Sequence, residues 1–108
     1  MTTLTFSFRG EDIIAVSVEG HSGQAEAGED VVCAGVSSAV QMVDCQLYMQ
    51  EINAEMTAEQ ETAKVNIRIN DKEEIARAQL TLRSFRIVAK MWQEEYPDYI
   101  SIQEVKLL

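Results

Sequence analysis

The chain is poor in the residues on which several large classes of protein depend. It holds nine Lys and Arg against 18 Asp and Glu, for a formal net charge of −9 at pH 7. Binding to a phosphate backbone needs clustered basic residues, and none occur here, so we expect no direct contact with nucleic acid. The apolar runs are much shorter than a bilayer-spanning stretch, and no charged leader precedes an apolar segment. These absences predict a cytoplasmic protein without a membrane partner.

Cysteine and histidine are equally scarce. The 108 residues include two cysteines and one histidine. One histidine and two distant cysteines do not make a metal-ligand set, so no metal and no other cofactor is expected. Both cysteines fall in one predicted helix, where twelve residues span about 18 Å, whereas the Cα atoms of a disulfide lie within about 7 Å. We therefore expect two free thiols, which suit a reducing compartment.

The chain has 46% apolar residues and no internal repeat, which is typical of one globular domain over residues 1–108. Apolar residues alternate with polar ones in four segments, which predicts four strands. The first two, around residues 4–8 and 14–18, form a hairpin across a turn at residues 9–12. The third covers residues 65–69 and the fourth begins at Ile100. The polar stretch from Ala54 to Glu61 is interpreted as a connection.

Apolar residues at intervals of three and four predict two helices. The first begins after Asp30, a good N-cap residue, and runs to about Asn53. The second begins after Asn70 or Asp71 and stops at Pro97. The order ββαβαβ predicts an α+β fold, with both helices packed on one face of a mainly antiparallel four-stranded sheet. Apolar surface left exposed by so small a domain favours a homodimer.

Three methionines, Met42, Met49 and Met56, recur at heptad spacing. Such a series is typical of core packing, and an adaptable binding or dimer face is the alternative.

The residues that can carry chemistry gather between Gly20 and Cys33. Three glycines predict a loop over residues 20–29, and the only histidine, His21, lies near its start. With Asp30 as N-cap, Cys33 is the third helical residue, where the helix dipole and the backbone N–H groups favour thiolate over thiol. The same N–H groups can stabilise the oxyanion that forms when a thiolate attacks a carbonyl. The pattern therefore indicates a nucleophile at Cys33.

His21 can serve as the general base and acid, because an imidazole exchanges protons near neutral pH. Asp30 can orient His21 or can act only as the cap, and Ser37 can hydrogen-bond near the thiol or to a helix carbonyl. The residues alone also allow a simpler interpretation, in which Cys33 fills the core and His21 is a turn residue. Cys45 has no histidine near it in the sequence and is interpreted as a packing residue.

The run Gly20-His21, followed by Gly28-x-Asp30-Val31-Val32-Cys33-Ala34-x-Val36-Ser37, resembles the ribosomal-processing cysteine protease family, Prp. The similarity includes the opening hairpin and the closing segment Tyr96-Pro97-Asp98-Tyr99-Ile100. Two departures leave Cys33 and His21 in place. Gly35 stands where the family often has alanine, and Asp44-Cys45-Gln46-Leu47 lacks the usual asparagine before its leucine.

The resemblance implies a cysteine endopeptidase that removes the N-terminal extension of large-subunit ribosomal protein 27 during ribosome maturation. The family cuts after an apolar segment that ends in paired phenylalanines. Cys33 would be the nucleophile and His21 the proton donor and acceptor, and Gly20, Asp30 and Ser37 match other motif positions. The resemblance also implies a homodimer. Two alternatives come from other classes: a non-catalytic ribosome-associated binding or assembly module, and a redox-sensing thiol protein, which would lack a nearby resolving cysteine.

Overall fold

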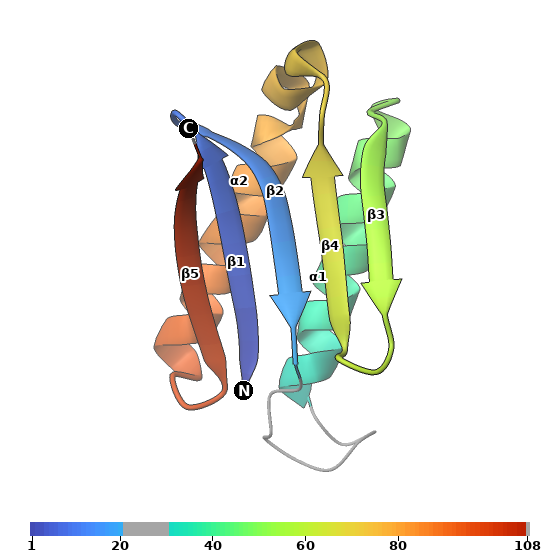
Figure 1. The fold of residues 1–108 in the computed structure, drawn as a ribbon. Coiled ribbons are helices and arrows are strands. Elements are labelled where there is room, and N and C mark those ends of the chain that lie inside the picture. The colour runs from blue at the N-terminus through green and yellow to red at the C-terminus, as the bar shows by residue number, and fades with distance from the viewer. Residues whose placement is uncertain (21–30, 108) are drawn as a thin grey trace.

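A computed structural model describes residues 1–20 and 31–107 of the chain. The elements in this part of the chain follow the order β1 (Thr2–Arg9), β2 (Asp12–Glu19), α1 (Val31–Met49), β3 (Ala54–Glu59), β4 (Lys64–Ile69), α2 (Lys72–Glu95) and β5 (Ile100–Leu107). The predicted opening hairpin and both predicted helices are present. Figure 1 shows α1 and α2 together on one face of the sheet, as expected.

The sheet is mixed and has five strands in the order β3-β4-β2-β1-β5. Three neighbouring pairs are antiparallel, whereas β1 and β5 are parallel, with Thr2 opposite Ile100. The prediction of a four-stranded sheet was wrong because the supposed connection from Ala54 contains β3. This strand lies at an edge, and five of its six residues are exposed. Backbone pairing with β4 rather than burial makes it a strand, so no apolar alternation marks it.

The direction of β5 follows from the path of α2. Figure 1 shows that α2 returns the chain along the sheet from the end of β4 to the start of β5, which lies beside β1. A crossover helix of this kind allows two parallel strands in one sheet. Asp71 caps the start of α2 as predicted, and its side chain accepts hydrogen bonds from the backbone N–H groups of Glu73 and Glu74.

The core lies between the sheet and the two helices. The apolar side chains that β1 and β2 direct toward the helices are mostly buried, and Leu4 and Phe6 are fully buried. Phe85 of α2 packs edge-on against Phe6, with ring centroids 5.9 Å apart. Neither α1 nor α2, the helices of the described residues, has an apolar stretch long enough to cross a bilayer.

Helix α1 ends at Met49, earlier than the predicted Asn53. Glu51 has the left-handed conformation, with φ of +58°. The N–H of Ile52 then donates to the carbonyl of Leu47, and the N–H of Glu51 donates to that of Tyr48. These are the two hydrogen bonds of a Schellman motif, which satisfies the last helix carbonyls and turns the chain. Ile52 and Leu47 are both buried, which adds the apolar contact of the motif.

Candidate active site

Cys33 is the third residue of α1 and is half-buried. It lies in the first turn, at the positive end of the helix dipole, where a negative charge is stabilised. No acidic residue of that first turn offsets the dipole. Cys45 is exposed on the same helix, and neither of the two cysteines is in a disulfide. Cys33 therefore lies where the helix dipole acts, whereas Cys45 lies about three turns further along α1.

A pocket of about 760 Å³ opens beside Cys33. Its walls are the N-terminal half of α1, the end of β2 and the β3–β4 hairpin. The apolar part of the lining consists of Val18, Ala34, Val36, Val40, Met56, Ala58, Ala63 and Val65. Around it lie polar side chains that include Ser37, Gln41, Glu59, Gln60 and Lys64. The pocket therefore offers an apolar surface with a polar border next to a thiol, as a site for an apolar peptide side chain requires.

Ser37 lies one helical turn after Cys33, and both residues line this pocket. Gly20 lines the same pocket, so three of the predicted site residues lie around one pocket, and their roles stay a prediction. The other two predicted residues, His21 and Asp30, lie outside the described part of the chain.

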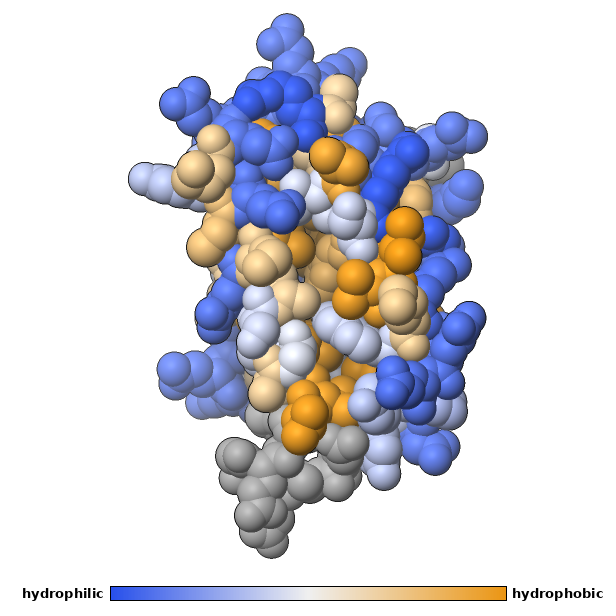
Figure 2. Space-filling model, turned by 180° about the vertical axis from the view of Figure 1, so that it is seen from behind, coloured by the Kyte–Doolittle hydropathy of each residue, from blue (hydrophilic) through white to orange (hydrophobic). Residues whose placement is uncertain are grey.

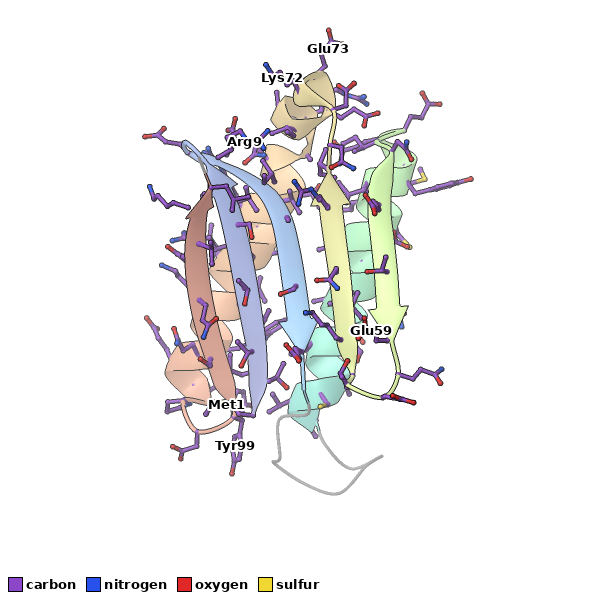
Figure 3. All side chains as sticks on the ribbon, in the orientation of Figure 1. Met1, Arg9, Glu59, Lys72, Glu73 and Tyr99 are labelled. Atoms are coloured by element: carbon purple, nitrogen blue, oxygen red, sulfur yellow. The ribbon has the colours of Figure 1, made fainter. Side chains whose placement is uncertain are left out.

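Gly20 directly follows the last residue of β2, lines the pocket and forms hydrogen bonds with two other segments of the chain. Its N–H donates to the carbonyl of Ala63 at 3.1 Å, and its carbonyl accepts from the Thr2 hydroxyl at 3.2 Å. Its φ is +88°, and an added Cβ would lie 2.7 Å from the Met1 carbonyl oxygen. Figure 3 shows Met1 and Glu59 at this end of the sheet, opposite the end that carries Arg9 and Lys72. Only glycine fits here, so Gly20 fixes where the chain leaves the sheet, directly before His21.

We expect Gly20→Ala to destabilise the protein more than Gly10→Ala. Gly10 also has a positive φ, of +62°, but nothing lies within 4 Å of an added Cβ. The left-handed conformation alone should cost about 1–2 kcal/mol in each variant. The overlap with Met1 should add at least about 1 kcal/mol for Gly20→Ala. Urea unfolding of the two variants measures the difference, and equal losses would contradict a packing role for Gly20.

The part of the pocket that β3 and β4 contribute is not predicted by the sequence pattern. The wall formed by Met56, Ala58 and Glu59 lay inside the segment interpreted as a connection. Met56 carried one signal, its place in the methionine series, but core packing, the interpretation preferred for that series, was wrong, because all three side chains are exposed. Met42 and Met49 lie exposed on α1, whereas Met56 lies on β3.

Among the described residues, no three His, Cys, Asp or Glu side chains lie close enough together to hold a metal ion. What the described part of the site offers is a thiol, a helix dipole and an apolar pocket. These groups suit attack of a thiolate on the carbonyl of a bound apolar peptide.

Comparisons with known proteins also indicate a cysteine protease family. A protein-family model described as cysteine protease Prp matches residues 1–101. Crystal structures of the essential ribosomal processing protease Prp from S. aureus match with 23% identity, covering 96% of this chain and 99% of theirs. The TM-score is 0.86 for the complex with a covalently linked product peptide and 0.83 for that with a substrate peptide. SMU.848 from Streptococcus mutans matches with a TM-score of 0.86 and 20% identity, over 99% of this chain and 96% of its own. No curated protein matches significantly.

Proposed function

Because the chain belongs to the family of cysteine protease Prp, we propose that it is a cysteine endopeptidase that removes the N-terminal extension of large-subunit ribosomal protein 27. The observation that carries the proposal is the place of Cys33, in the first turn of α1 and at the wall of an apolar pocket. The similar fold of a ribosomal processing protease that was crystallised with a substrate peptide supports the same class of substrate.

In the proposed reaction, the Cys33 thiolate attacks the carbonyl carbon of the scissile peptide bond. A C–S bond forms, and an electron pair moves onto the carbonyl oxygen, which lies near the positive end of the α1 dipole. His21 donates a proton to the leaving nitrogen as the C–N bond breaks. Water then attacks the thioester while His21 accepts its proton. Release of the Cys33 thiolate leaves a new carboxylate on the cleaved extension.

The pocket beside Cys33 supports an apolar residue at the cleavage site. An apolar side chain next to the scissile bond can enter between α1 and the β3–β4 hairpin, against Val40 and Met56. The polar border, with Gln41 and Gln60, leaves hydrogen-bonding groups for the peptide backbone. A bulky apolar segment that ends at the scissile bond would match this pocket, whose lining has an apolar part and a polar part.

Two further residues are proposed as accessory groups. Asp30 is proposed as the cap of α1, with orientation of His21 as the alternative role, and Ser37 is proposed to supply a hydroxyl near the thiol from within the same pocket. We also propose that the enzyme is cytoplasmic, needs no cofactor and acts as a homodimer.

The test is incubation of the protein with full-length ribosomal protein 27 that carries its extension. Mass spectrometry should show one cut, with the extension released as a peptide that ends in an apolar segment. An unchanged substrate would contradict the proposal and favour a binding or assembly module that keeps the fold without the chemistry.

We expect His21→Ala to lower the cleavage rate about 10²–10⁴-fold, because general acid–base catalysis contributes about that factor. Peptide affinity, measured by fluorescence anisotropy, and the melting temperature serve as controls and should change little. A His21→Ala variant that cleaves at the normal rate would remove His21 from the mechanism.

A further inference from the structure

Thr2 carries a buried hydroxyl that the proposed mechanism does not use. Among the described residues, Thr2 and Thr81 are the two buried polar ones, and Thr2 is only 2% exposed. Thr2 begins the row of β1 that continues with Leu4 and Phe6 toward the helices. Figure 2, seen from the helix side, shows side chains covering this face of the sheet. A hydroxyl buried there costs free energy unless it is hydrogen-bonded, so its hydrogen-bond partner indicates its role.

The Thr2 hydroxyl donates to the carbonyl oxygen of Gly20, which is 3.2 Å away and 18 positions along the chain. Valine has nearly the same shape as threonine and would fill a buried strand position without burying a polar group. What the hydroxyl adds is therefore this hydrogen bond. Thr2 also borders the pocket together with Gly20 and Cys33, but its burial leaves little of its surface for a bound peptide.

The backbone of Thr2 is itself held in the sheet. Its N–H donates to the carbonyl of Tyr99 at 2.9 Å, and Thr2 lies opposite Ile100 in the parallel pairing of β1 with β5. Figure 1 shows the start of β1 between the end of β2 and the start of β5. The hydroxyl therefore reaches from a fixed strand to Gly20, the residue that directly follows β2.

Gly20 is held at both of its backbone polar groups. Its N–H donates to the carbonyl of Ala63 at 3.1 Å, and its carbonyl accepts from the Thr2 hydroxyl. A glycine has more backbone freedom than any other residue, so these two hydrogen bonds limit a conformation that the side chain cannot limit. The Gly20 carbonyl belongs to the same planar peptide unit as the N–H of His21. The direction of that carbonyl therefore sets the direction in which His21 is attached.

From these contacts we propose that Thr2 is a positioning residue for the peptidase reaction. Its hydroxyl orients the peptide unit between Gly20 and His21, and with it the backbone from which the His21 imidazole exchanges its proton. The inference rests on the proposed function, in which His21 is the general acid and base. Thr2 acts through His21 and not on the substrate, because Gly20 takes up its hydroxyl. Proton transfer needs groups within hydrogen-bond reach, so a misplacement of about 1 Å can lower a rate by about 100-fold.

Steady-state cleavage of the extended ribosomal protein 27 by three variants tests the proposal. Thr2→Val removes the hydroxyl at nearly equal volume and should lower kcat about 10-fold or more, while KM changes less than about twofold. Thr2→Ser keeps the hydroxyl and should retain most of the wild-type rate. Thr3→Val is the matched control, because Thr3 is the next residue of β1 and its side chain lies on the opposite face of the sheet. It should cleave at the wild-type rate, and melting temperatures check that each variant is folded.

A double-mutant cycle separates positioning of His21 from a purely structural role. Thr2→Val should cause no further loss of rate in a His21→Ala protein, because the group that Thr2 positions is then absent. A structural role would lower the rate by the same factor in both backgrounds. That additive result, or a Thr2→Val protein with the wild-type kcat, would overturn the inference and leave the proposed function intact. A wild-type protein that cleaves nothing would overturn the proposed function, and this role of Thr2 with it.

Discussion

Cys33→Ala is expected to abolish cleavage of the extended ribosomal protein, with a fall in rate of at least about 10⁴-fold. The thiol is the only group that the proposed mechanism bonds to the substrate, and its loss leaves no nucleophile beside the pocket. Cys33 is half-buried at the pocket wall, so alanine leaves the core unchanged. The variant should fold normally and should still bind the substrate peptide.

Cys45→Ala is the matched control, because Cys45 lies on the same helix but outside the pocket. It should retain the full cleavage rate. The reactivity of the remaining thiol gives a second measure: iodoacetamide should modify Cys33 in Cys45→Ala faster than it modifies Cys45 in Cys33→Ala. Undiminished cleavage by Cys33→Ala would refute the mechanism, and slow alkylation of Cys33 would favour a binding module.

Phe85→Ala should cause a large loss of stability. Phe85 is 4% exposed and lies at the contact between α2 and the sheet. Its ring packs edge-on against the rings of Phe6 and Trp92, with centroid distances of 5.9 and 6.2 Å. Truncation removes both ring contacts and leaves a cavity, which typically costs about 3–5 kcal/mol. Because small domains are stable by only about 5–15 kcal/mol, a large share of the protein should be unfolded at elevated temperature.

Urea unfolding at one fixed protein concentration measures this loss, since association would otherwise shift the midpoint. Glu94→Ala is the control, because Glu94 is exposed on the same helix. It should change the free energy of unfolding by no more than about 0.5 kcal/mol. A Phe85→Ala loss as small as that of the control would contradict the central place of Phe85 in the core.

The sequence identified the part of the site that is local in the chain. Cys33 and Ser37 are four residues apart on one helix, so helical periodicity alone places them on the same side. The opposite wall comes from Met56, Ala58 and Lys64, which reach the pocket only because β3 and β4 pair and fold over α1. No local sequence pattern predicts that the β3–β4 hairpin lies beside α1. Family resemblance, rather than spacing, singled out Gly20, and the structure supplies the reason in its positive φ and its contact with Met1.

The sequence by itself determined which segments are helices, which carry a buried strand face, and that Cys33 stands at a helix start. Each of these properties depends on the periodicity and capping of neighbouring residues. Only the tertiary structure decided the edge strand β3, the parallel pairing of β5 with β1 and the pocket. An exposed edge strand is held by backbone hydrogen bonds, which any side chains allow, and strand order depends on how distant elements pack. Neither the edge strand nor the strand order therefore requires apolar side chains at fixed intervals. For this reason neither of them can be recognised as a pattern in the sequence.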